Sequence, residues 1–123
     1  MNGDAVLFDS NVMIYLSKRE LPLGLVEKFD DIRISVVTYM EILGFNFRNS
    51  LEESLVKELV ELFETVFINQ SIADKVVEIR RNHTIKLPDA IIAATADCEN
   101  LKLVTRNTED FKNLGIPLID PFL

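Results

Sequence analysis

The chain has 123 residues and carries 13 basic against 20 acidic side chains, which gives a net charge of −7 at pH 7. Apolar residues make up 48% of it, enough to fill the core of one domain over residues 1–123, so disorder is not expected. We expect a cytoplasmic protein without membrane association, because no apolar run approaches the ~20 residues of a membrane span and no signal-peptide pattern is present. The single Cys98 excludes an internal disulfide and a cysteine zinc site, and we expect it in the core.

The first half of the chain predicts two strands, each followed by a helix. "AVLF" (5–8) is a short apolar strand, and "DSNVMIYLSK" after it predicts a helix that Ser10 or Asn11 can cap. "LGLVEKF" allows one or two helical turns, and the alternating, β-branched "IRISVV" (32–37) predicts the second strand. A helix beginning at a Thr38 cap follows in "TYMEILGFNF". The inner face expected for the first helix consists of Val12, Ile14, Tyr15 and Leu16.

The second half continues the alternation. "SLEESLVKELVELFETV" predicts a helix with a Ser50 cap, "VFIN" (66–69) a strand, and a further helix begins at a Ser71 cap. "KLPDAIIAATA" predicts a helix buried on every side, before the strand "LKLVT", a helical turn in "TEDFKNL" and a last strand in "IPLID". In the helix predicted for "SLEESLVKELVELFETV", the side chains expected to face the core are Leu55, Leu59, Leu62, Phe63 and Val66. Strands that alternate with helices predict an α/β fold of three layers, with a parallel sheet between helices.

Four carboxylates from distant parts of the chain are expected at one edge of this sheet. Asp9 directly follows the first strand, and Glu41 lies one turn into the helix after the second. Asp89 opens the helix that returns to the strand "LKLVT", and Asp110 follows that strand. The carboxyl ends of parallel strands lie at the same edge, where open α/β sheets bind their ligands. The sequence therefore predicts a functional site there.

Each acid also has a simpler interpretation. Asp9 could cap the first helix, and Asp89 could interact with the dipole of its own helix, worth ~0.3–1 kcal/mol. Glu41 could be a solvated helix residue, and Asp110 could merely adjoin a helix cap. Clustered carboxylates, however, raise each other's pKa unless a cation holds them.

A cation would also reconcile the acidic composition with a nucleic-acid substrate, since proteins that bind phosphates by charge neutralisation are usually basic. The cations that suit an all-oxygen site are Mg²⁺ and Mn²⁺. Such a site can cleave phosphodiesters without a histidine or serine nucleophile. The only histidine, His83, lies in a basic stretch away from the acids in sequence.

Four motifs, "VLFDSNVMIYL", "SVVTYMEILGF", "IKLPDAIIAATA" and "LVTRNTEDF", resemble those of the PIN-domain ribonucleases, and within them the VapC-type toxins of prokaryotic toxin–antitoxin pairs. They occur in the family's order and spacing over essentially the whole chain. The resemblance implies a PIN-like sheet of about five strands in the order 3-2-1-4-5 and a Mg²⁺ or Mn²⁺ site that hydrolyses RNA. The family's catalytic, metal-binding acids fall on Asp9, Glu41, Asp89 and Asp110. Its supporting polar positions fall on Ser10, Thr105 and Asn107.

We therefore expect a metal-dependent endoribonuclease, the toxin of a VapBC-type pair. Asp9, Asp89 and Asp110 would bind metal directly or through water, and Glu41 would be a ligand or orient the attacking water. In-line attack on a backbone phosphate would leave 5′-phosphate and 3′-hydroxyl ends. The resemblance also implies a VapB-like antitoxin and a homodimer, with candidate partner surfaces in "ILGFNF" and "MIYLSK". The phenylalanines of "ILGFNF" could instead pack in the core.

Basic side chains beside the predicted site are candidates to bind RNA. They are Arg80, Arg81, Lys86 and Arg106, with His83 in the same stretch as the first three. Arg80 and Arg81 could instead complement the C-terminus of their own helix.

The sequence matches two other functions of α/β domains less well. A receiver-type phosphoacceptor would have adjacent acids after its first strand and an aspartate after a middle strand, yet "FDSN" supplies one acid and "VFIN" ends without any. A phosphatase with an aspartyl nucleophile would usually have a second aspartate where Asn11 stands. Within the PIN fold, the alternatives are a nuclease of RNA processing outside a toxin–antitoxin pair and a non-catalytic binding module.

Overall fold

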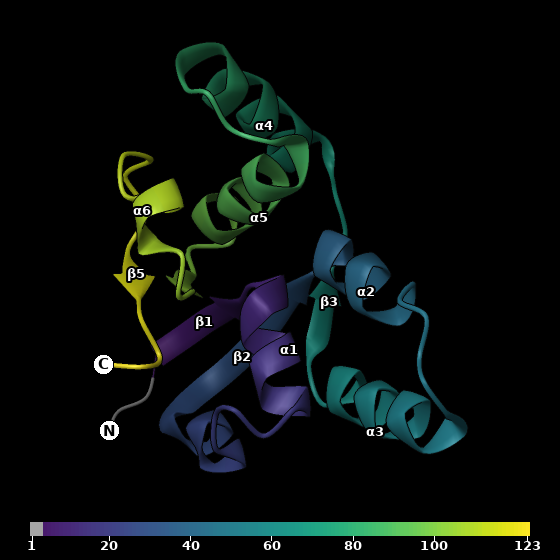
Figure 1. The fold of residues 1–123 in the computed structure, drawn as a ribbon. Coiled ribbons are helices and arrows are strands. Elements are labelled where there is room, and N and C mark those ends of the chain that lie inside the picture. The colour runs from purple at the N-terminus through teal and green to yellow at the C-terminus, as the bar shows by residue number, and fades with distance from the viewer. Residues whose placement is uncertain (1–3) are drawn as a thin grey trace.

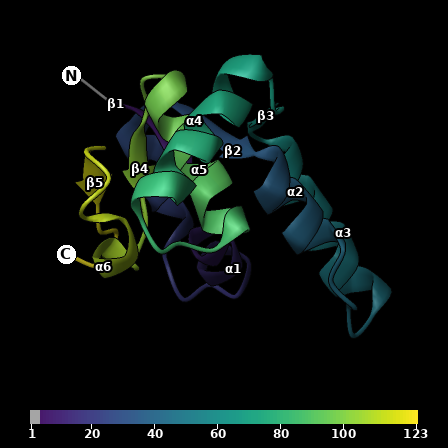
Figure 2. The same ribbon diagram turned by 90° about the horizontal axis from the view of Figure 1, so that it is seen from above.

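The computed structural model describes residues 4–123 and contains a five-stranded parallel sheet between two layers of helices (Figure 1). The order β3-β2-β1-β4-β5 is the predicted one, and Figure 2 shows β5 and β3 at opposite ends of the sheet. The strands are β1 (Asp4–Phe8), β2 (Phe29–Ser35), β3 (Glu64–Val66), β4 (Lys102–Val104) and β5 (Leu118–Ile119).

Helices cover both faces of the sheet, as a parallel sheet requires. The helices are α1 (Ser10–Ser17), the short 3-10 helix η1 (Leu23–Lys28), α2 (Val36–Leu43), α3 (Ser50–Glu61), α4 (Gln70–Asn82), α5 (Leu87–Cys98) and α6 (Thr108–Phe111). In Figure 1, α4 and α5 lie above the sheet and α1 and α3 lie below it. No helix within residues 4–123 is long and apolar enough to cross a membrane.

Alternation along β1 divides the core between the two faces. Leu7 packs with α4, α5 and α6, whereas Val6 and Phe8 pack with α1, α3 and the end of α2. The same alternation continues on β4, where Leu103 and Val104 enter opposite clusters. Residues adjacent in the sequence thus stabilise opposite layers, which fixes the register of the two central strands.

Helix α5 is buried as the sequence predicts. Four alanines, an isoleucine and a threonine have almost no exposed surface: Ala90, Ile92, Ala93, Ala94, Thr95 and Ala96. Small side chains let α5 approach both α4 and the sheet closely, so its first turn is held at the carboxyl edge.

Asp9 caps the first helix, which was one of the alternatives expected from the sequence, in place of Ser10 or Asn11. The other three predicted caps, Thr38, Ser50 and Ser71, are wrong by one to three residues. The caps are Asp9, Ser35, Asn49 and Asn69, and each side chain accepts a hydrogen bond from a backbone N–H two or three residues later, at 2.8–3.1 Å. Each of these residues is the last in extended conformation before its helix. Consequently β2 ends at Ser35, and the residues of "VV" that were predicted as strand open α2.

Several predicted core positions are also wrong. Leu62 is 68% exposed and Leu55 about half exposed, because α3 packs on neighbouring helices through Val56, Leu59 and Val60 instead. In α1, Met13 is buried and Ile14 is exposed, the reverse of the expected face. Strand β3 lies two to three residues earlier than predicted, which leaves Phe67 and Ile68 on the surface. Cys98 is exposed in the last turn of α5, with its Sγ 3.6 Å from the Ser71 carbonyl oxygen.

Candidate active site

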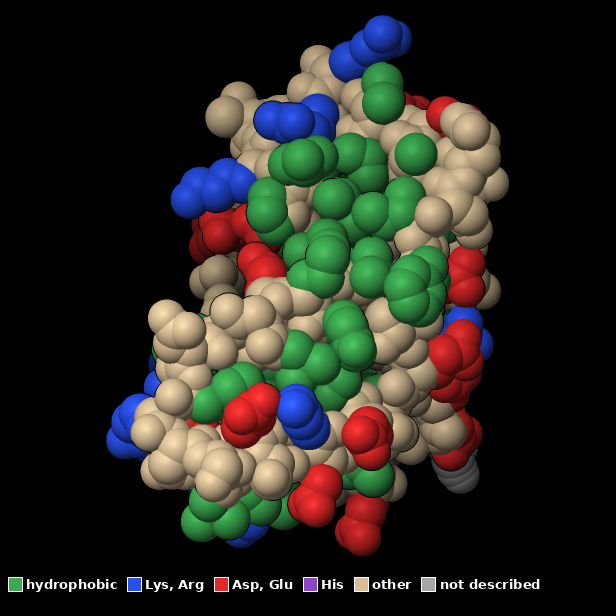
Figure 3. Space-filling view, turned by 90° about the vertical axis from the view of Figure 1, so that its right-hand side faces the viewer, with side chains coloured by type: hydrophobic (Ala, Val, Ile, Leu, Met, Phe, Trp, Pro, Cys, Tyr) green, Lys and Arg blue, Asp and Glu red, His purple; other side chains and the backbone are tan. Residues whose placement is uncertain are grey.

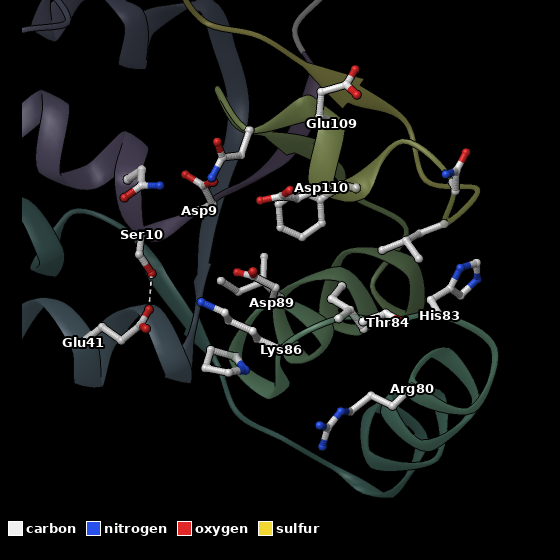
Figure 4. A pocket seen from close by; sticks show the side chains of 18 residues that line it. Asp9, Ser10, Glu41, Arg80, His83, Thr84, Lys86, Asp89, Glu109 and Asp110 are labelled. Carbon is white, nitrogen blue, oxygen red and sulfur yellow. Dashed lines mark hydrogen bonds between the residues drawn. The ribbon is translucent and has the colours of Figure 1, made fainter.

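A cavity of about 930 Å³ at the carboxyl edge of the sheet is lined by all four predicted acids. Asp9 follows β1, Glu41 lies on α2, Asp89 in the first turn of α5 and Asp110 on α6. In Figure 4 the carboxylates of Asp9, Asp89 and Asp110 point toward one another across the cavity, and Glu41 approaches from the α2 side. The fold therefore brings together acids that are up to 101 positions apart in the sequence, from 9 to 110.

Asp9 is both a helix cap and the innermost acid of the cavity. Its side chain is only 4% exposed, and Oδ1 accepts from the Val12 N–H at 2.9 Å while Oδ2 accepts from the Thr105 hydroxyl at 2.5 Å. Burial raises its pKa, the hydrogen bonds from Thr105 and Val12 oppose that shift, and the charge of Asp89 adds to it. Capping occupies one lone pair of one oxygen, so it does not prevent Asp9 from binding a cation.

Asp89 makes no capping hydrogen bond, although it lies in the first turn of α5. The side chain is half-buried, and its pKa is raised by burial first and then by the charges of Asp110 and Glu41. Lys86, the residue before α5, acts in the opposite direction. Asp89 therefore shares an electrostatic field with two other acids, which a simple helix-dipole role does not require.

Glu41 is exposed but held in place by a chain of hydroxyl groups. The Ser10 hydroxyl donates to Glu41 Oε1 at 2.5 Å and lies 3.0 Å from the Thr38 hydroxyl. A serine hydroxyl has one proton, so Thr38 must donate to Ser10 when Ser10 donates to Glu41. Thr38 was predicted to be a helix cap, and its contact with Ser10 was not predicted. Its spacing of three residues from Glu41, on one face of α2, is the signal that could have revealed it.

The other two polar residues predicted beside the acids lie around Asp9. Thr105 is fully buried, and besides donating to Asp9 it accepts from the backbone N–H of Asn107 at 3.0 Å. Asn107 lines the cavity without capping α6 through its side chain. A fifth acid, Glu109, also lines the cavity, but its carboxylate pairs with Lys112 at 2.8 Å and points away from Asp110 in Figure 4.

The donor set fits a hard divalent cation, since the cavity offers carboxylate, hydroxyl and amide oxygens and two of its acids have raised pKa values. Within residues 4–123, however, no three acidic, histidine or cysteine side chains are gathered closely enough to form a ready-made metal site. These carboxylates would have to approach one another more closely to hold one cation.

The predicted RNA-binding residues divide into two groups. Arg80, His83 and Lys86 line the cavity on the side of α4 and α5, whereas Arg81 does not. Arg106 also lies outside it, because its guanidinium packs on the rings of Phe122 and Tyr15.

An apolar face extends over the side of the molecule that carries α2, α3 and α4 (Figure 3). Phe45 is 67% exposed, so core packing is the wrong interpretation for it, whereas Phe47 is partly buried against the core. The large exposed apolar residues of α2, α3, α4 and the segments that adjoin them are Tyr39, Met40, Phe45, Leu51, Leu55, Leu62, Phe67, Ile68 and Val77, and we call them the apolar face.

Comparisons with known proteins agree with this fold. Residues 6–117 match the sequence model of the PIN domain. A toxin–antitoxin complex from Klebsiella pneumoniae contains a chain that is 37% identical, with a TM-score of 0.80 over 95% of this chain and 98% of that one. DNA-bound VapBC from Salmonella typhimurium aligns with a TM-score of 0.83 at 22% identity, over 95% and 98% of the two chains. FitAcB from Neisseria gonorrhoeae aligns with a TM-score of 0.76, also at 22% identity and over 95% and 98%. No curated protein sequence gives a significant match.

Proposed function

The chain belongs to the PIN-domain family, and on this premise we propose that it is a Mg²⁺- or Mn²⁺-dependent endoribonuclease and the toxin of a VapBC-type pair. The observation that carries the proposal is the convergence of Asp9, Glu41, Asp89 and Asp110 on one cavity. The pKa values of Asp9 and Asp89, raised by burial first and further by neighbouring carboxylates, support it, because buried carboxylates that repel one another gain most from a bound cation.

The four acids would have different roles, in metal binding or in orienting water, according to their positions. Asp9, Asp89 and Asp110, whose carboxylates face one another, would hold the metal. A bound divalent cation activates water and stabilises negative charge on a phosphoryl group. Glu41, whose Oε1 is held by Ser10, would use Oε2 to orient the attacking water and receive its proton. Thr105 and Ser10 would keep the rotamers of Asp9 and Glu41 fixed before substrate arrives.

The reaction would be an in-line displacement at phosphorus. The water oxygen forms a bond to the phosphorus, the bond to the 3′ oxygen breaks, and that oxygen takes up a proton, so that 3′-hydroxyl and 5′-phosphate ends result. The ammonium group of Lys86, beside Asp89, would contact the phosphate of the bound strand.

The test uses the two adjacent acids of α6. Asp110→Asn should lower Mg²⁺-dependent RNA cleavage by about 100-fold or more, as expected for loss of a metal-orienting charge. Glu109→Gln is the matched control, since its carboxylate pairs with Lys112 and points away, and it should retain activity within a few-fold. EDTA should abolish cleavage by both the parent and the control. Equal cleavage by the parent and Asp110→Asn, or full activity in EDTA, would refute the assignment.

An antitoxin partner and a homodimer are further parts of the proposal. One support is the 37% identity, over 95% of this chain, to a chain of a toxin–antitoxin complex. The other is the apolar face, because a patch of many exposed apolar side chains, unlike single scattered ones, is typical of a protein–protein interface. Sedimentation at micromolar concentration tests the homodimer, and a monomer there would contradict it. A short upstream gene that encodes a DNA-binding fold with a disordered tail would support the antitoxin, whereas its absence would favour a role in RNA processing.

A further inference from the structure

An arginine and two aromatic rings form a cation–π cluster at the carboxyl edge, outside the acidic cavity. The guanidinium carbon of Arg106 lies 4.4 Å from the ring centroid of Phe122 and 5.8 Å from that of Tyr15. The two rings meet edge to face, with centroids 5.1 Å apart. Arg106 is exposed, and Phe122 is 40% exposed. The cluster joins α1, the segment after β4 and the C-terminal segment after β5.

The cluster begins where the cavity ends on the α1 side. Asn11 and Asn107 line the cavity. Tyr15 lies one helical turn after Asn11 on the same face of α1, and Arg106 directly precedes Asn107. Arg80 and Lys86 line the same cavity, and we infer that a strand in contact with Lys86 and the acids continues to Arg106.

The charge of Arg106 is available to an external group. Within residues 4–123, no carboxylate lies within ion-pair distance of it, although the protein carries an excess of acids. Phe122 supports the guanidinium from one side. A guanidinium that lies over a ring and has no carboxylate partner keeps N–H donors for a ligand, and unpaired bases stack on guanidinium and aromatic planes.

We propose that Tyr15, Arg106 and Phe122 form a binding site for a nucleobase of single-stranded RNA, adjacent to the phosphate at the acidic cavity. This inference deepens the proposed function and rests on it for the identity of the substrate. Stacking would hold the flanking nucleotide and thereby place the phosphodiester over the acids. Stacking accepts every base, so this site would contribute affinity and positioning more than sequence selectivity.

The experiment measures binding rather than cleavage. A labelled, short single-stranded RNA and an otherwise identical strand of abasic ribose phosphates are titrated in EDTA, so that neither is cut. For the parent, the strand with bases should bind about 5- to 10-fold more tightly than the abasic strand, as base stacking predicts. Arg106→Lys keeps the charge but loses the plane, and Phe122→Leu keeps an apolar side chain but loses the ring.

Both variants should bring the ratio of the two affinities, for the strand with bases and for the abasic strand, close to one. The affinity for the abasic strand itself should stay the same. Lys28→Ala, at the amino edge of the sheet, is the control for a surface cation and should keep the parent ratio. If the variants melt at lower temperature but keep the ratio, the cluster only anchors the C-terminal segment and the inference is overturned. Cleavage by the parent, measured separately with Mg²⁺, reports on the proposed function, so the two failures are distinguishable.

Discussion

Replacing Thr105 with valine should test how the acidic site is held together, because it removes one buried hydroxyl and keeps the shape of the side chain. That hydroxyl is fully buried, donates to Asp9 Oδ2 at 2.5 Å and accepts from the Asn107 N–H at 3.0 Å. Thr105→Val thus removes a charge-assisted bond and leaves one backbone N–H without its partner. Thr105→Ser keeps both bonds and loses only a methyl group.

The expected change in the free energy of unfolding follows from the loss of these two hydrogen bonds. A hydrogen bond to a charged group contributes about 1.5–3 kcal/mol, so the free energy of unfolding of Thr105→Val should fall by about 2–3 kcal/mol at neutral pH. For a chain of this length, that corresponds to roughly 10 °C in Tm. Thr105→Ser should lose about 1 kcal/mol, the contribution of one buried methyl group.

The difference between the variants should depend on pH. Burial raises the pKa of Asp9, and the Thr105 hydrogen bond opposes that shift, so the pKa of Asp9 in Thr105→Val should be higher still. The bond favours the carboxylate, hence its contribution is complete above the higher pKa that Asp9 has in Thr105→Val and is lost as the pH falls through the pKa of Asp9 in the folded parent. The acid limb of RNA cleavage should also move to higher pH.

Urea unfolding in EDTA, at neutral pH and at about pH 4, measures the loss in free energy of unfolding of each variant and its dependence on pH. Equal destabilisation of Thr105→Val and Thr105→Ser, or a difference in stability between them that is the same at both pH values, would refute this role of the hydroxyl group. Either result would mean that the hydroxyl contributes packing alone.

Three further variants or conditions test the same site. Thr38→Val should lower RNA cleavage by about 5- to 10-fold through loss of the bond that orders Ser10, while Thr38→Ser retains activity; equal losses in the two would contradict the hydroxyl chain. Lys86→Met should raise the pKa of Asp89 and move the acid limb of the pH–rate profile upward; an unmoved profile would exclude this coupling. Mg²⁺ at about 100 times its Kd should stabilise the parent by about 2.7 kcal/mol in thermal melts, reversibly with EDTA. A Mg²⁺ response of the same size at the same concentration in Asp89→Asn would argue against metal binding by Asp89.

The sheet was predictable because it depends on long-range features of the chain. Apolar runs separated by helical segments define parallel connections, and small errors in their bounds do not alter this arrangement. The strand order itself was expected from the resemblance to the PIN-domain family. The caps were not predictable to the residue, since "RNS" and "NQS" each offer competing side chains. Asn49 and Asn69 cap because each is the last extended residue, and the packing of the whole helix decides where the extension ends.

In the site, likewise, the positions of the acids were predictable and the directions of long side chains were not. Topology brings acids after β1 and β4 to one edge, whatever their rotamers. The direction of a long side chain depends instead on its neighbours, as Arg106 shows by packing on Phe122, a residue 16 positions later that no motif connects to it. Thr38 was missed for a similar reason, because its partner Ser10 comes from another helix.

Net charge is a poor guide to the ligand here, because charges of the two signs are distributed unequally. Arg33 pairs with Asp31 and Glu99, and Lys102 pairs with Asp4, so these cations are neutralised within the protein. Among the described residues, Lys86 and Arg106 at the carboxyl edge have no such carboxylate partner. A divalent cation among the four ionised acids would leave two negative charges, which Lys86 and Arg106 offset. The net repulsion of phosphate at this edge would thereby be removed, and an acidic protein could bind a phosphate strand there.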